Sequence, residues 1–136
     1  MGRKAQLIIL DSVGAARYRL AVTQDRFRRI ALGMEGASES AHMGHPDFRV
    51  NGRIFATIAP AGRRGMVKLP PDEQQAFVRR NPAAFEPASG AWGRQGCTMV
   101  VFEKVDEETL GEAMTLAWKN AAGRIRRPPR RSGLRK

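Results

Sequence analysis

The stretch HPDFRVNGRIFATI, residues 45–58, decides the fold of this chain. Two runs with strand-type residues flank Asn51-Gly52. Asn-Gly between such runs is the strongest short signal for a β-hairpin, because a type I′ turn needs positive φ at both central positions. Alternation along the two strands then assigns one face to the core, and the predicted core face carries Phe48, Val50, Ile54, Ala56 and Ile58.

The other face of the hairpin raises the question of function. Alternation places Arg49 and Arg53 on it, together with Phe55 and Thr57. A hairpin can enter a groove of DNA as a β-ribbon, and arginine is the usual reader of guanine edges. The alternative is a solvated face of a half-buried hairpin, with the arginines paired to Asp47 or Glu103.

Two helices are predicted next to the hairpin. Thr23 can cap a helix that runs to about Leu32 and stops at Gly33, and one apolar stripe of this helix carries Phe27, Ile30, Ala31 and Met34. Pro70-Pro71 begins a second helix, which ends near Arg80 because Asn81 precedes a proline.

The last helix has the clearest pattern. Asp106 can cap it, and Gly123 is expected to end it. Apolar residues recur at helical spacing between these limits, at Leu110, Ala113, Met114, Ala117, Trp118 and Ala121. We therefore expect this helix to pack on the core through one stripe.

Further strands are predicted at 66–69 and 97–102, and residues 7–10 are apolar enough to add a short one. Residues 38–44 are interpreted as a polar connector, 59–65 as a flexible turn and 87–96 as a glycine-rich loop. Strands between terminal helices favour the α+β class. We expect a single compact domain, an antiparallel sheet with the N- and C-terminal helices on one face.

The charge distribution predicts three segments. The net charge is +11, made of +3 in 1–22, +1 in 23–122 and +7 in 123–136. We interpret 1–22 as an N-terminal extension, 23–122 as the domain and 123–136 as a disordered basic tail. Val22 directly precedes the domain, and we hypothesise that residues 1–21 result from the choice of start site.

Length and composition favour one soluble domain. A chain of 136 residues suits a single core, and one cysteine, Cys97, excludes an internal disulfide framework. The longest N-terminal apolar run, residues 7–10, is too short for a signal peptide or a membrane span. We expect a cytoplasmic protein with no membrane partner, and favour a monomer.

Several motifs in order resemble the MmcQ/YjbR-like family. They are ALGMEG at 31–36, HMGHPDFRVNGRIFATI at 42–58, VKLPPDEQ at 67–74, GAWGRQG at 90–96 and VDEETL at 105–110. The resemblance covers about residues 23–122. It implies a fold like that of bacterial frataxin, also described as a double-wing DNA-binding fold, and it brings a DNA-binding label that itself derives from the fold. It brings no catalytic residue set.

Metal and catalytic interpretations are weak. Iron needs clustered oxygen ligands, whereas the first helix has one acid, Asp25, among its arginines. His42, His45 and Asp47 have the residue types of a metal site, and Ser40, His42 and Asp47 those of a hydrolase triad. The zinc ligand set is incomplete, and no nucleophile elbow surrounds the serine. We predict no catalytic, metal-binding or cofactor-binding residue.

The favoured function is non-catalytic DNA binding, dominated by phosphate contacts and with low sequence specificity. Trp92, beside Arg94, can either stack on a base or plug the edge of the core. The basic tail is a second, independent polyanion binder. The candidate DNA-binding residues are Arg49, Arg53, Arg63, Arg64, Lys68, Trp92, Arg94, Arg124, Arg126, Arg127, Arg130 and Arg131.

Two alternatives belong to other functional classes. One is a small-ligand pocket or weak enzyme around His45, Arg49, Arg53 and Trp92. The other is a protein-interaction module that uses the open face of the sheet. A large uncharged apolar patch would favour the protein partner, and a contiguous basic hairpin surface would favour DNA.

Overall fold

The computed structural model describes residues 5–10, 16–20, 22–42 and 44–126. Its helices and strands follow one another as β1 (Ala5–Leu10), β2 (Ala16–Leu20), α1 (Gln24–Leu32), β3 (Ser38–His42), β4 (His45–Val50), β5 (Arg53–Ile58), β6 (Arg64–Lys68), α2 (Pro71–Arg80), β7 (Phe85–Pro87), α3 (Gly90–Arg94), β8 (Cys97–Val101) and α4 (Glu107–Arg126). A single 3-10 turn, Phe102–Lys104, joins β8 to the last helix.

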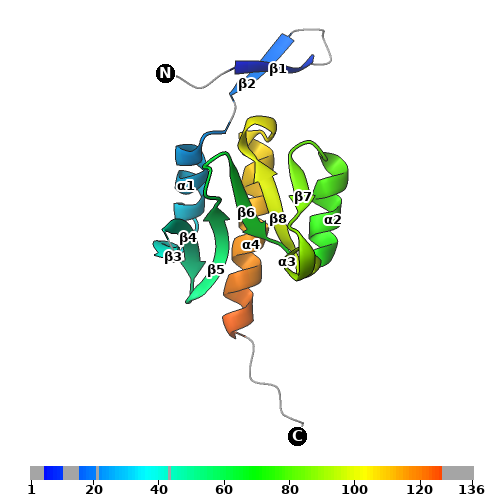
Figure 1. Cartoon of the computed structure of the whole chain (residues 1–136). Helices are drawn as coiled ribbons and strands as arrows, with labels where there is room; N and C mark the ends of the chain where they lie inside the picture. The colour runs from blue at the N-terminus through cyan, green and yellow to red at the C-terminus, as the bar shows by residue number, and fades with distance from the viewer. Residues whose placement is uncertain (1–4, 11–15, 21, 43, 127–136) are drawn as a thin grey trace, which may run out of the picture.

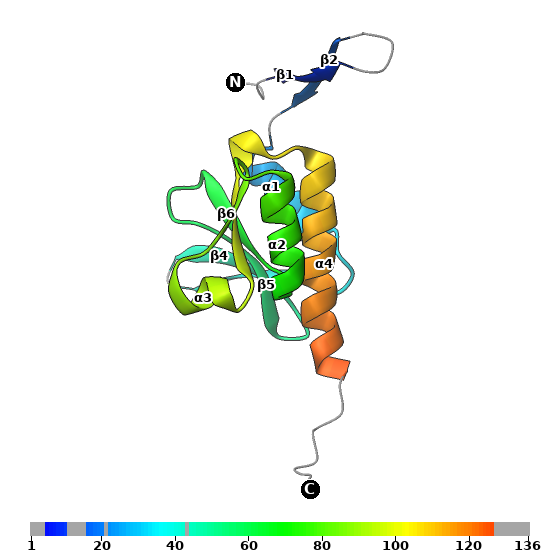
Figure 2. The same ribbon diagram turned by 90° about the vertical axis from the view of Figure 1, so that its right-hand side faces the viewer.

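Six strands form one sheet in the order β3-β4-β5-β6-β8-β7. Every neighbouring pair in this sheet is antiparallel. Helices α1, α2 and α4 cover one face, and the short α3 lies on the other side (Figures 1 and 2). The predicted α+β architecture is confirmed. No helix in the described ranges is long and apolar enough to cross a membrane.

The Asn51-Gly52 hairpin forms as predicted. Both residues have positive φ, 53° at Asn51 and 78° at Gly52, as a type I′ turn requires. The predicted alternation of the second strand fails at Phe55. Phe48 pairs with Ala56 but Arg49 pairs with Ile54, so Phe55 is an extra residue in a β-bulge.

This bulge reverses the predicted faces of three residues of β5. Arg53 pairs with the buried Val50 and so lies on the face of the core, not on the outer face with Arg49 as predicted. Phe55 is fully buried, although alternation had placed it on the outer face. Ile54, predicted to lie in the core, is only half-buried, because its pairing with Arg49 puts it on the face that the helices leave open. The bulge thus gives the open face an apolar side chain beside an arginine.

The core lies between the sheet and helices α1, α2 and α4. Phe27 of α1 contacts the rings of Phe48 and Phe102, with centroids 6.2 and 5.1 Å away. The predicted stripe of α4 is buried except at Trp118, which is half-buried and donates its indole N–H to the Glu35 carbonyl at 2.8 Å. Val22, placed by the sequence in the extension, is buried in this core.

Both predicted helix caps form. The Thr23 hydroxyl accepts the Arg26 amide at 3.0 Å, and the Asp106 carboxylate accepts the Thr109 amide at 2.8 Å. The predicted end of the last helix is wrong, because α4 continues through Gly123 to Arg126. A single glycine costs a helix only about 1 kcal/mol, which the flanking helix formers tolerate. The predicted disordered tail is therefore helical over its first four residues, 123–126.

Several short elements were not predicted, among them β2 and the 3-10 turn. The presumed connector contains the edge strand β3, the presumed loop around Trp92 contains α3, and β7 forms the opposite edge. The predicted short strand at 7–10 lies within β1, which pairs with β2 in a separate hairpin. Arg127, Arg130 and Arg131 lie outside the residues that the structure describes.

Candidate nucleic-acid interface

Three predicted cationic residues meet at one rim of the sheet. Arg49, Arg53 and Lys68 line a hollow of about 310 Å³. The β4–β5 turn and α4 complete it, through Gly52, Asn120 and Ala121. No carboxylate is among the described residues that line this hollow, which we call the basic rim. Its side chains can bind an anion such as a phosphate group.

Helix α4 forms one side of the basic rim through Asn120 and Ala121. The sequence analysis did not predict that this helix lies beside the hairpin. The Asn120 side chain donates a hydrogen bond to the Lys68 carbonyl at 3.2 Å and so joins α4 to the end of β6. Figures 1 and 2 show the hairpin turn at the same end of the molecule as the last turns of α4. Helix α4 thus ends, at Arg126, at the same end of the molecule as the basic rim (Figures 1 and 2).

One of the three cations is already paired. Arg49 donates two hydrogen bonds to the Asp47 carboxylate, at 2.9 and 3.2 Å. This bond raises the pKa of the Arg49 guanidinium above its usual value, so the residue keeps its charge. Asp47 is buried, and the predicted pairing of Arg49 with it is confirmed. Arg53 and Lys68 have no acidic partner among the described residues, so their charges are available to a ligand.

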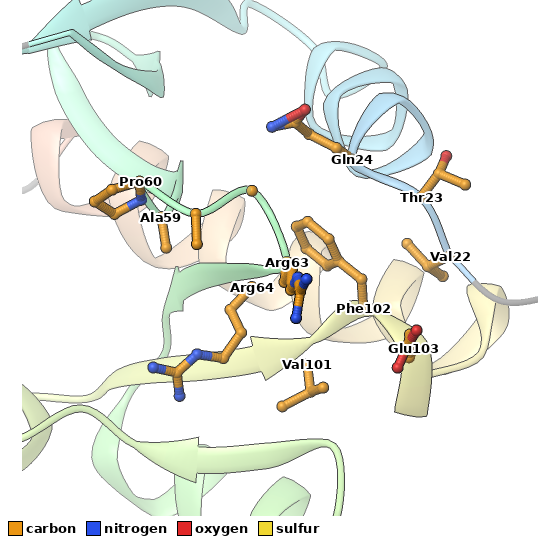
Figure 3. A pocket seen from close by; sticks show the side chains of 12 residues that line it. Val22, Thr23, Gln24, Ala59, Pro60, Arg63, Arg64, Val101, Phe102 and Glu103 are labelled. Carbon is orange, nitrogen blue, oxygen red and sulfur yellow. The ribbon is translucent and has the colours of Figure 1, made fainter.

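The other predicted basic pair lies at a second hollow, of about 850 Å³. Figure 3 shows this hollow between the start of α1 and the β5–β6 turn, with Phe102 between them. Arg63 and Arg64 line it together with Glu103. Arg64 also pairs with Glu86 at 3.3 Å. Acids therefore lie beside both arginines here, whereas Arg49 is the residue of the basic rim that has an acidic partner among the described residues.

Trp92 projects from the open side of the sheet. Its exposed fraction is 67%, which excludes the interpretation as a plug of the core. It lines a hollow of about 370 Å³ with Ile54, Met66 and Met99. The same hollow, which we call the apolar face, also includes His45, Pro46, Asp47, Thr57, Pro60 and Cys97.

A buried amide holds α3 and therefore Trp92. The Gln74 side chain donates to the carbonyls of Gly93 and Cys97, both at 3.0 Å. Gly93 packs so tightly that a Cβ atom there would lie 1.8 Å from the Ala88 carbonyl oxygen. Sequence reasoning missed Gln74, and the signal was its place three residues before Phe77 on the apolar side of α2.

Two comparisons with known proteins bear on the family and the fold of this chain. The model of the YjbR family matches residues 32–120, which is more than half of the chain. The chain belongs to the YjbR family. The crystal structure of the Deinococcus radiodurans protein DR2400, a DUF419 domain, is similar at a TM-score of 0.62 and 17% identity, over 83% of this chain and 94% of that one. That likeness supports the fold alone. No curated protein matches the chain.

In this YjbR-family protein, the four residues of the predicted small-ligand pocket do not line one hollow. His45 and Trp92 line the apolar face, whereas Arg49 and Arg53 line the basic rim. Arg94 is exposed on α3. The predicted DNA-binding residues of the domain are thus divided among the basic rim, α3 and the β5–β6 turn.

The described residues do not assemble the metal site or the triad that the sequence suggested as weak alternatives. No group of three metal-ligating side chains is found in the described part of the chain. The backbone register sets Ser40 opposite Asp47 and His42 opposite His45. Since both oxygens of Asp47 accept hydrogen bonds from Arg49, its carboxylate is engaged by a guanidinium rather than free to orient a histidine.

Cys97 is a buried thiol below the apolar face. Burial raises its pKa, and the nearby Lys68 ammonium lowers it by less. A neutral thiol is a weak nucleophile. The sequence-based interpretation of Cys97 as a small core residue agrees with this environment.

Proposed function

We propose that this YjbR-family protein is a non-catalytic DNA-binding protein of the cytoplasm that contacts phosphates with low sequence specificity. The observation that carries the proposal is the basic rim, where Arg53 and Lys68 lack acidic partners among the described residues. Phosphate contacts supply most of the affinity of such binding. We also predict that the protein is a monomer.

The C-terminal arginines support the same proposal. The backbone of α4 runs past the basic rim to Arg126, and more arginines follow in the sequence. The cations of the basic rim and the arginines that follow in the sequence can contact phosphates together. Cations arranged in this way give affinity without base readout.

The test is DNA affinity against salt, measured by fluorescence anisotropy on the full chain. Arg53→Ala/Lys68→Ala removes two charges from the basic rim. Arg79→Ala/Lys104→Ala removes two charges from exposed sites on α2 and the 3-10 turn and serves as the matched control. We expect the rim variant to lower the slope of log K against log[salt] by about 2, and affinity by about tenfold.

A third variant separates the rim from the tail. Arg130→Ala/Arg131→Ala tests the tail alone and is expected to lower the slope by about 2 as well. If the rim variant behaves like the Arg79/Lys104 control while the tail variant loses affinity, the folded domain is not the DNA surface. The small-ligand alternative would then be the function to pursue, with the apolar face as its site.

A further inference from the structure

Two hollows of different chemistry adjoin on this molecule. Ile54 lines both the basic rim and the apolar face. The Asp47–Arg49 ion pair also crosses the boundary, since Asp47 lines the apolar face and Arg49 the basic rim. Lys68 of the basic rim pairs across the strands with Cys97 of the apolar face. The two hollows therefore form one continuous surface.

The apolar face follows a row of cross-strand partners. Thr57, Met66 and Met99 are paired in register across β5, β6 and β8. Residues paired in this way lie on the same side of a sheet. Asp47 continues the row into β4. The result is a row of methionine and threonine side chains on one side of the sheet, in the hollow that Trp92 also lines.

Trp92 lies on the short helix α3, which a hydrogen bond from Gln74 attaches to α2. A lone exposed tryptophan would need no explanation. Here the ring stands on a helix that Gln74 fixes by hydrogen bonds, and it borders apolar side chains of the sheet. An indole held in this way gives a stacking partner at low cost in conformational entropy.

We propose that this continuous surface binds single-stranded nucleic acid in preference to a duplex. An unpaired base would stack on Trp92 over the apolar face, and the adjoining phosphates would contact Arg53 and Lys68. A duplex keeps its bases stacked on each other, so it cannot offer their faces to an indole. This inference rests on the proposed function and specifies the class of nucleic acid.

The experiment compares a labelled oligothymidylate of roughly 20 nucleotides with a duplex of the same length, on the full chain, by anisotropy. The wild-type protein is expected to bind the single strand at least tenfold more tightly. Trp92→Ala is expected to lower single-strand affinity about tenfold and to change duplex affinity less than twofold. Trp92→Phe keeps a stacking ring and should retain most of the affinity.

Trp92 is exposed, so its replacement should leave the fold intact, which an unchanged melting temperature would verify. Quenching of tryptophan fluorescence by the oligothymidylate, lost in Trp92→Phe, supplies a second readout of stacking. Because Trp118 is half-buried in α4, it remains as an internal reference.

Three results would overturn the inference. Equal affinity for both forms, with Trp92→Ala unchanged and Arg53→Ala/Lys68→Ala weakened on both, leaves the proposed function in place but removes the stacking site. Absence of binding to either form removes the proposed function as well. Concentration-dependent self-association that Trp92→Ala abolishes assigns the apolar face to a second copy of the chain.

Discussion

Two ends of the sheet each carry a pair of basic residues, and their neighbours differ. At the β4–β5 turn, Arg53 and Lys68 line a hollow without a carboxylate among its described residues. At the β5–β6 turn, Arg64 pairs with Glu86 and Glu103 lines the same hollow as Arg63. The two ends have similar sequences of glycine and arginine. From this difference we expect neighbouring acids, rather than the number of arginines, to decide which end holds a phosphate.

Charge reversal should separate the two ends most strongly. Arg53→Glu/Lys68→Glu is expected to lower DNA affinity about 100-fold at low salt, because four units of charge change at the proposed phosphate site. Arg63→Glu/Arg64→Glu makes the same charge change at the other end and is expected to cost less than about fivefold. Anisotropy titrations of both variants check this. Equal losses would break the comparison.

The shape of the β4–β5 turn supports the basic rim. Asn51 has φ of 53°, which a β-branched residue adopts only with strain. Asn51→Val should therefore lower the free energy of unfolding by about 1–2 kcal/mol, whereas Asn51→Gly should be nearly neutral. Urea denaturation measures both. If Asn51→Val costs nothing, this turn does not hold the hairpin in register.

The acid partners at the two ends allow a finer test. Asp47→Asn removes the buried partner of Arg49 and is expected to raise DNA affinity about threefold while destabilising the fold. Glu86→Gln removes an exposed partner of Arg64 and is expected to change affinity less than twofold. Melting curves and anisotropy report the two effects separately. A larger gain from Glu86→Gln would reverse the assignment of the ends.

The smallest predicted effect concerns the thiol beside Lys68. Because burial raises the pKa of Cys97 above the ordinary value of a cysteine thiol, less thiolate is present in the folded protein than in the unfolded chain at pH 8. Folding should therefore slow the reaction of the thiol with a disulfide reagent. By linkage, the stability from the neutral thiol is present below pH 9 and is lost as the pH rises through the folded pKa. Reaction at the rate of the denatured chain would contradict the burial.

Local signals in the sequence correctly predicted two helix starts and the central hairpin turn. Thr23, Asn51-Gly52 and Asp106 each act through hydrogen bonds or dihedral angles within a few residues, and each behaves as predicted. Edge strand β3 is polar and edge strand β7 has only three residues, so each is held by its pairing with a neighbouring strand rather than by its own pattern. Periodicity cannot identify elements of that kind.

The candidate site was only partly predictable for the same reason. Arg49, Arg53 and Lys68 were predicted, but their meeting with Asn120 depends on how α4 packs. The bulge at Phe55 shifts the alternation by one residue, and nothing within residues 53–58 announces it. The exposure of Trp92 follows from the position of α3, which Gln74 fixes from α2. Each of these facts depends on contacts between separate elements.

The central claim is that the rim beside the β4–β5 turn contacts nucleic acid. The most direct measurement is a titration of the ¹⁵N-labelled full chain with an oligonucleotide, followed by amide chemical shifts. We expect the largest shifts at Gly52, Arg53, Lys68 and Asn120, with little change at the β5–β6 turn or on α2. Shifts confined to the residues after Arg126, or centred on Arg63 and Arg64, would contradict the claim.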